Sequence, residues 1–248
     1  MRVCFVSAIR GQHRLVSEHV AISTCSRAES VDRNVRRLIL TTPPAPEETP
    51  RLTFVGNATS VLHLGGCRIL TDPSFLHAGD HAHLGYGVFA KRLLEPAMQY
   101  ADLPPIDAVL LSHLHADHWD NAAERAIDRK MPIITTRRAC HALMQRHFSN
   151  SLGLSTWETI AVDKAGAAGL NITAVPAQHG PQPLAALLPE TNGFVIEVPQ
   201  SGSRSLRIYM SGDTVLHKAL KEIPQRYPEI DVALLNLGGT KIPSARVA

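Results

Sequence analysis

The chain has 248 residues, of which 44% are hydrophobic, so it can bury one sizeable core. Its formal net charge is only +3, and aromatic residues make up 5% of the sequence. These values give no indication of the strongly basic surface or the stacking platforms that are typical of nucleic-acid-binding proteins. No apolar run approaches the roughly 20 residues of a membrane span, and the four scattered cysteines predict free thiols in a reducing, cytoplasmic compartment.

Residues 1–50 differ in composition from the rest of the chain. They start with a short apolar run that lacks the cleavage site of a signal peptide, and they end in the proline-rich stretch 41–50. Such a stretch is typical of a linker. We therefore expect residues 1–50 to form a poorly ordered extension that adds little to the core, and residues 51–248 to form the folded domain. The alternatives are a docking arm or a natural start downstream of Met1.

The domain should open with three strands, over residues 52–56, 60–64 and 67–70, with a hairpin turn at Gly65-Gly66. Asp72 follows the third strand and precedes a proline. It is either the first residue of a turn or a carboxylate that orients a metal-bound histidine. Residues 74–105 form a long, irregular connection, which is either a functional loop or an ordinary insertion. If it is functional, His83 and Tyr86 are candidates for substrate contact.

A polar cluster follows the apolar residues 108–111, which we expect to form a buried strand. Four potential metal ligands lie within six residues: His113, His115, Asp117 and His118. The spacing of the first two places both imidazoles on the same side of an extended backbone. Four ligands this close cannot easily surround one tetrahedral ion, so a second ion is the simpler interpretation.

Helices alternate with strands in the remaining sequence, a pattern that indicates helices layered over a sheet. Two polar residues again follow strands directly. His179 is either surface or the third nitrogen ligand of the first ion, and Asp213 could cap the helix that we expect after it. We expect helices over residues 121–129, 137–147 and 215–226, and strands over residues 131–135, 159–162, 170–175, 194–198, 206–210 and 232–235.

The His-x-His-x-Asp-His sequence after an apolar strand resembles the signature of the metallo-β-lactamase superfamily. The resemblance implies an α/β fold, a four-layer αββα sandwich, with a one- or two-metal site at one sheet edge. It also implies that His179 is the third histidine and that Asp213 is a carboxylate shared by two metals. Relatives carry one more histidine in a C-terminal unit that this chain lacks, and we expect a truncated fold, a weak second site and impaired hydrolysis. His217 is a poor substitute for that histidine.

The chemistry that the resemblance implies is attack by a metal-bound hydroxide on a carbonyl or phosphorus. His113, His115 and His179 would hold the first metal, and Asp117, His118 and Asp213 the second. Asp117 would alternatively accept the proton of the nucleophile. Zinc suits the nitrogen-rich ligands, with manganese and iron as alternatives.

Several segments are similar to the branch that includes N-acyl-phosphatidylethanolamine phospholipase D and ascorbate-phosphate lactonase. These segments are 71–73, 83–87, 192–194 and 211–214. The similarity favours a small or lipid-like phosphodiester or lactone over a β-lactam. Two other functions remain open: a metal-binding remnant without activity, and a hydrolase that processes nucleic acid.

Overall fold

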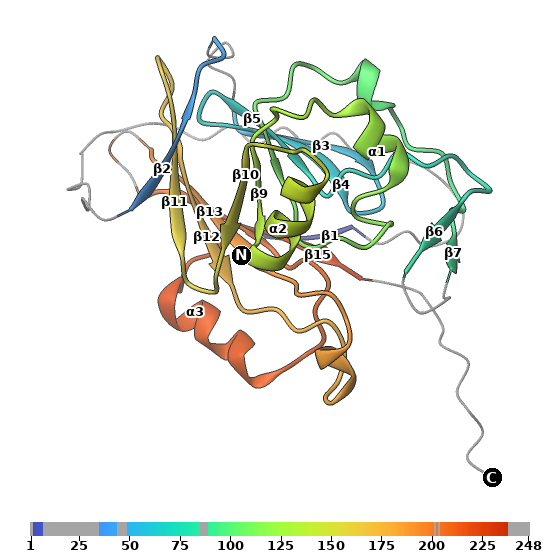
Figure 1. Ribbon diagram of the computed structural model, residues 1–248. Helices are drawn as coiled ribbons and strands as arrows, with labels where there is room; N and C mark the ends of the chain where they lie inside the picture. Colours follow the sequence, from blue (N-terminus) through green and yellow to red (C-terminus); the bar gives the residue numbers. More distant parts are fainter. Residues whose placement is uncertain are drawn as a thin grey trace.

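The computed structural model describes residues 2–6, 35–43, 49–84, 89–200, 202 and 204–237, with residues 2–6 and 184 described by their backbone alone. Two large sheets form its centre (Figure 1). The first has six strands in the order β10-β9-β8-β5-β4-β3. Its strands are β3 (Arg51–Gly56), β4 (Thr59–Leu64), β5 (Cys67–Thr71), β8 (Ala108–Leu110), β9 (Ile133–Thr136) and β10 (Ser151–Leu154).

The second sheet has seven strands in the order β1-β15-β14-β13-β12-β11-β2. Its strands are β1 (Arg2–Val6), β2 (Arg36–Leu40), β11 (Thr159–Lys164), β12 (Leu170–Val175), β13 (Gly193–Val198), β14 (Leu206–Met210) and β15 (Val232–Asn236). A small hairpin, β6 (His81–His83) with β7 (Phe89–Lys91), interrupts the connection that we expected to be irregular.

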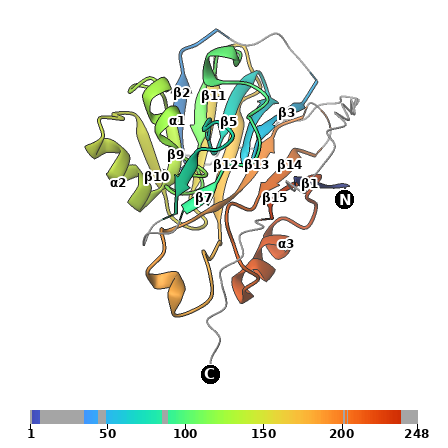
Figure 2. The ribbon, with the colours of Figure 1, turned by 90° about the vertical axis from the view of Figure 1, so that its right-hand side faces the viewer.

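Few helices accompany the sheets. The α-helices are α1 (Asn121–Ala126), α2 (Arg137–Gln145) and α3 (Glu222–Arg226), and the 3-10 helices are η1 (Tyr100–Asp102), η2 (Leu184–Ala186) and η3 (Lys218–Lys221). Figure 2 shows α1 and α2 on one side of the sheets and α3 on the other. In the described part of the chain, none of these helices is long and apolar enough to cross a bilayer.

The core has three layers of contact, because side chains alternate between the two faces of each strand. Leu62 and Ile69 point inward and meet Ile172 and Ile196 of the other sheet. On the outer face of the six-stranded sheet, apolar strand residues pack against α1 and α2, and on the outer face of the other sheet they pack against α3. The predicted αββα sandwich is therefore confirmed.

Strand direction brings the polar residues after several strands to one end of the sandwich. β5 and β8 are parallel, and β12 and β14 run the same way because each is antiparallel to β13. Asp72, the histidine motif, His179 and Asp213 follow the ends of these four strands. The topology thus gathers them at one edge.

Strand β2 corrects the expected domain boundary at Arg51. It pairs in parallel with β11, and Leu38 and Leu40 are buried in the core between the sheets. Residues 36–40 therefore belong to the folded domain rather than to an extension. Only two side chains of this strand face inward, and its partner lies more than 100 residues away, so the local sequence carries little signal of a strand. Residues 44–48 lie outside the described part of the chain.

Leu38→Ala should lower the free energy of unfolding by about 2–5 kcal/mol, because it removes a leucine that is 7% exposed within the core. Ile39 is the matched control, since it is the next residue and is 71% exposed. Ile39→Ala should change stability by no more than about 0.5 kcal/mol. Urea denaturation measures both. Equal, small losses for the two variants would show that β2 does not pack as described.

The helix expected over residues 215–226 is wrong for its first part. His217 has an extended backbone, with φ −143° and ψ 167°, and the helical residues divide into η3 and α3. Pro224 lacks the N–H that would bond the carbonyl of Leu220, so one continuous α-helix cannot form here. Val215 instead donates its N–H to Gln178 O at 2.9 Å, which ties this segment to the loop that carries His179.

Candidate metal centre

The histidine motif forms a tight turn directly after β8. The N–H groups of His118 and Trp119 both donate to His115 O, at 2.9 and 2.7 Å. This turn brings His113 and His115 to the same side as His179, which arrives from the loop after β12. One ligand atom from each of these three histidines lies within 4.8 Å of the other two. Such a cluster has the size and nitrogen content of a three-histidine metal site.

Asp213 stands beside a second group, which consists of His113, His118 and Asp213 with ligand atoms again within 4.8 Å. Its Oδ1 lies 3.1 Å from His118 Nε2, and its Oδ2 lies 3.7 Å from His179 Nε2. The carboxylate therefore faces both groups. The helix that follows, η3, begins at Lys218 with His217 as its N-cap, so Asp213 does not cap it.

Asp117 lies close to the second group but is not one of its three members. Its Oδ2 is 3.9 Å from His118 Nε2. Its Oδ1 is buried and has no hydrogen-bond partner. An unpartnered buried carboxylate oxygen is costly unless a cation or a donor approaches it, so Asp117 also suits a site that binds a positive ion.

Asp72 holds two of the histidines in place. It is buried, and one oxygen lies 2.9 Å from His118 Nδ1. It also accepts hydrogen bonds from Ser112 N and Ser112 Oγ, at 2.7 and 2.9 Å. Ser112 Oγ in turn lies 2.9 Å from His113 Nδ1. With both Nδ1 atoms engaged in this way, the Nε2 atoms are directed to the centre, which is the usual arrangement around a metal-binding histidine. The sequence analysis missed Ser112.

The charge states of three of the four rings also suit a metal. Burial lowers the pKa of His113 well below its usual value, and burial together with His179 lowers the pKa of His115 to about 4. Burial lowers the pKa of His179 as well. His118 differs: burial opposes its charge, but Asp213 and Asp72 outweigh burial and raise its pKa. The three-histidine group is therefore neutral near pH 7, the form in which imidazole binds metals.

These residues fit a divalent cation. His113 Nε2 is buried without any hydrogen-bond partner, although a buried ring nitrogen normally has one. A cation between the three histidines would satisfy it. The donor set of three imidazoles with a nearby carboxylate is that of zinc and related transition metals.

Gly212 allows Asp213 to reach this position. Its φ is +57°, and a Cβ there would lie 2.6 Å from Asn192 O and 3.0 Å from Ser112 Cβ. Only glycine tolerates both this conformation and such a close approach. The segment that carries Asp213 therefore passes close to Ser112 and His113.

Asp120 is a second residue that the sequence analysis missed. Its buried carboxylate caps α1 through Ala123 N at 2.7 Å, and it also accepts from the backbone N–H groups of Phe75 and Leu76. It thus fixes the loop after Asp72 against the histidine motif. Its role is structural, and an N-cap pattern before residue 121 was the available signal.

The other sequence candidates are placed differently. His83 is exposed on β6, where its ring contacts Phe89 at 4.8 Å, and it belongs to neither described ligand group. Tyr86 lies outside the described residues. His217 lines an open hollow of about 480 Å³ together with His179.

This hollow adjoins the three-histidine group through His179. Its charged lining residues are Glu190 and Glu222, and no lysine or arginine lines it among the residues that the structure describes. Trp157 and several uncharged polar side chains, including Gln178 and Asn192, complete the wall.

Comparisons with known proteins agree with this architecture. The model of the beta-lactamase superfamily domain matches residues 37–244. The isothiocyanate hydrolase from Delia radicum gut bacteria is 30% identical in sequence, with a TM-score of 0.61, over 75% of this chain and 71% of that chain. A metal-dependent hydrolase of Thermococcus onnurineus is 28% identical over 76% of this chain and 72% of its own length.

Two further curated relatives are much longer than the region that matches. The mitochondrial N-acyl-phosphatidylethanolamine-hydrolyzing phospholipase D of Saccharomyces cerevisiae is 33% identical over 51% of this chain but only 26% of its own length. An uncharacterized protein of Mycobacterium tuberculosis is 28% identical over 75% of this chain and 48% of its own length. The chain thus spans between a quarter and a half of these two relatives.

Proposed function

Because the chain belongs to the β-lactamase superfamily, we propose that it is a metal-dependent hydrolase that cleaves an ester-type bond. One observation carries the proposal: three histidines, His113, His115 and His179, converge beside Asp213 at one sheet edge. Several relatives are described as metal-dependent hydrolases, which supports the same chemistry.

In this proposal His113, His115 and His179 hold one ion, and His118, Asp117 and Asp213 contribute to a second. Zinc is the first choice for nitrogen-rich ligands, and Mn²⁺ or Fe²⁺ are the alternatives where carboxylates share the site. Divalent cations bound here would act as Lewis acids: they would lower the pKa of a bound water to near neutral and polarise an oxygen of the substrate.

The protein's own groups then have distinct tasks. Asp72 and Ser112 fix the ring orientations of His118 and His113, so that the ligand atoms need not reorganise. Asp117 has an unpartnered, buried Oδ1 that is suited to accept the proton of an attacking water. The hollow beside His179 provides space for the part of the substrate that does not react.

The lining of the hollow supports a lactone over a phosphodiester. A phosphodiester is an anion, and its binding normally draws on arginine or lysine. Glu190 and Glu222 are the charged side chains of the described lining, so only the bound cations would attract an anion to the hollow. We propose a small, uncharged ester as substrate. We also propose a cytoplasmic location, because Cys67 and Cys140 are free thiols.

A second candidate reaction is hydrolysis of an isothiocyanate. The isothiocyanate hydrolase of known structure is 30% identical in sequence to this chain, and the match spans 71% of its length. The match to the yeast phospholipase D spans only 26% of that protein. An isothiocyanate is also uncharged, and water attacks its central carbon. The lack of lysine and arginine in the described lining supports this substrate class as well as a lactone.

The test is hydrolysis of a δ-lactone, phenethyl isothiocyanate and bis(4-nitrophenyl) phosphate by protein whose metal content is measured in parallel. We expect turnover of a neutral substrate that disappears on chelation and returns with Zn²⁺. His179→Ala should lose both an ion and the activity, while His141→Ala, an exposed helix histidine, should keep both. Metal-loaded protein that turns over none of the three substrates would oppose the proposal. A preference for the phosphodiester would overturn the substrate class alone.

A further inference from the structure

Asn57 connects two distant parts of the candidate metal centre. It lies in the turn between β3 and β4, and its Nδ2 donates to Asp117 O at 2.7 Å, across 60 residues of sequence. Asn57 has a φ of +53°, a left-handed conformation that asparagine adopts more readily than most residues. The bond fixes the backbone at the residue whose carboxylate approaches His118.

The turn that carries Asn57 is itself held rigidly. Thr71 Oγ1 donates to Ala58 O at 3.2 Å, and Thr59 Oγ1 donates to Asp72 O at 2.7 Å. The two turn residues Asn57 and Ala58 and the first residue of β4, Thr59, therefore contact Asp117, Thr71 and Asp72 in order. The turn spans the gap between the loop that carries Asp117 and the segment that carries Asp72.

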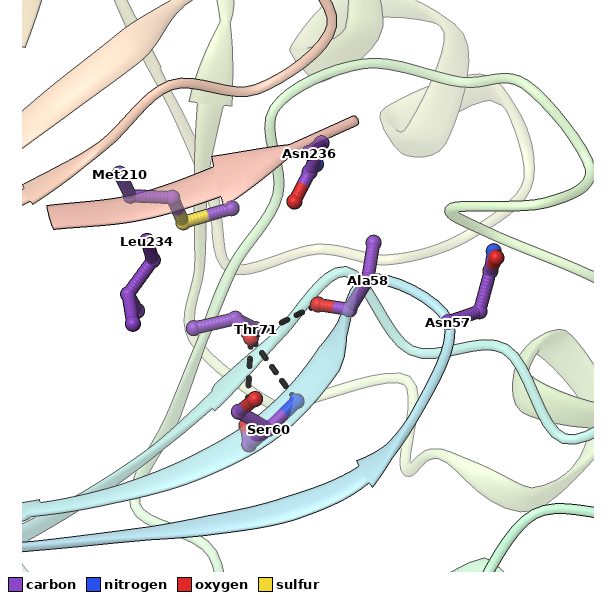
Figure 3. A pocket seen from close by; sticks show the side chains of 7 residues that line it. All are labelled: Asn57, Ala58, Ser60, Thr71, Met210, Leu234 and Asn236. Atoms are coloured by element: carbon purple, nitrogen blue, oxygen red, sulfur yellow. Dashed lines mark hydrogen bonds between the residues drawn. The ribbon is translucent and has the colours of Figure 1, made fainter. Parts of the chain in front are cut away.

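Figure 3 shows this turn at the rim of a small cavity of about 10 Å³ between the two sheets. Ser60 and Thr71 are joined by hydrogen bonds on its floor, and the Asn57 side chain points away from them. The cavity has room for no more than about one water molecule. The turn is therefore held by Thr71 on the side of the cavity, and the Asn57 side chain reaches Asp117 on the other side.

We propose that Asn57 is a positioning residue for Asp117 and thereby sets the affinity of the second metal position. The proposal rests on the proposed function for the ion, but its structural part does not. Loss of the Nδ2 donor frees the Asp117 backbone and lets the carboxylate turn away from His118. In the described contacts Asn57 touches none of the three histidines, so the affinity of their group should fall much less.

Two variants test this proposal against a matched control. Asn57→Gly keeps the left-handed backbone and removes the donor, and Asn57→Asp keeps the size and removes the donor. Asn150→Asp is the control, because Asn150 Nδ2 also donates to a backbone carbonyl, Lys130 O at 3.4 Å, outside the described ligand groups. Zn²⁺ titration with chelator competition measures the two affinities, and hydrogen exchange followed by mass spectrometry measures the motif without metal.

Both Asn57 variants should lower the affinity for the second ion by about 10- to 100-fold and change the affinity for the first ion much less. In the metal-free protein, the exchange rates of the His118 and Trp119 amides should rise by roughly fivefold to tenfold, which corresponds to the net free energy of one hydrogen bond. Asn150→Asp should change neither value. Unchanged exchange in the Asn57 variants would overturn this proposal, and that measurement needs neither a second ion nor hydrolytic activity. The proposal about Asn57 can therefore fail independently of the proposed function. Equal weakening of both ions also overturns it.

Discussion

Replacement of Asp72 by alanine is expected to weaken metal binding by about 10- to 100-fold at each position and to remove most hydrolytic activity. The carboxylate contacts His118 directly and His113 through Ser112 Oγ, so both groups lose the support that directs their Nε2 atoms inward. His113 belongs to both ligand groups, which is why the loss should extend to both ions.

Ser112→Ala separates the two links of Asp72. It removes the hydroxyl between Asp72 and His113 but leaves the contact with His118, so the effect should be smaller than that of Asp72→Ala. Asp80→Ala is the control, since Asp80 is an exposed carboxylate that accepts only from a neighbouring backbone N–H in the described contacts. Metal titration of the three variants gives the order. Wild-type affinity in Asp72→Ala would mean that the rings are held by other contacts.

The largest loss of stability should follow from breaking the ion pair between Lys164 and Asp107. The Lys164 Nζ lies 2.7 Å from Asp107 Oδ2, and the side chains are 2% and 5% exposed. Lys164 ends β11, while Asp107 precedes β8, so the pair joins the two sheets at the end away from the histidines. Asp107→Ala should cost roughly 3–5 kcal/mol, because it leaves a buried ammonium without a counter-charge.

Two comparisons separate this cause from the loss of packing. The double variant Asp107→Ala with Lys164→Met should recover a large part of the stability, because no unpaired charge remains. Asp163→Ala breaks the Arg37–Asp163 pair, which is equally short at 2.6 Å but is 42% and 45% exposed, and should cost no more than about 1 kcal/mol. Guanidinium denaturation measures all three. A double variant as unstable as Asp107→Ala would show that the charge is not the cause.

The sandwich and most of its strands could be predicted because their signals are local. The hairpin at Gly65-Gly66 needs left-handed backbone, and both glycines have it, with φ of 55° and 78°. The strands that flank it alternate between the two faces as their sequence indicates. Strand β2 could not be found in this way, because what fixes it is a partner strand far along the chain.

The same division holds in the candidate site. His113 and His115 are two residues apart, so extended backbone alone brings them together. His179 joins them only through the tertiary fold, and its role rested on a family resemblance rather than on spacing. Ser112 and Asn57 had no signal at all, because each acts through a single hydrogen bond to a group that only the fold brings near.

Strand β2 also determines the order in which the second sheet can assemble during synthesis. Its residues leave the ribosome before those of β11, the strand beside it, which follow some 120 residues later. At about 5–20 residues per second, β2 waits roughly 6–24 s for that neighbour. During this interval Leu38 and Leu40 have no apolar surface of their own sheet to cover them, and an unpaired strand is open to association with other chains. Slower translation should lengthen this interval and so increase association of the unfinished chain with other chains.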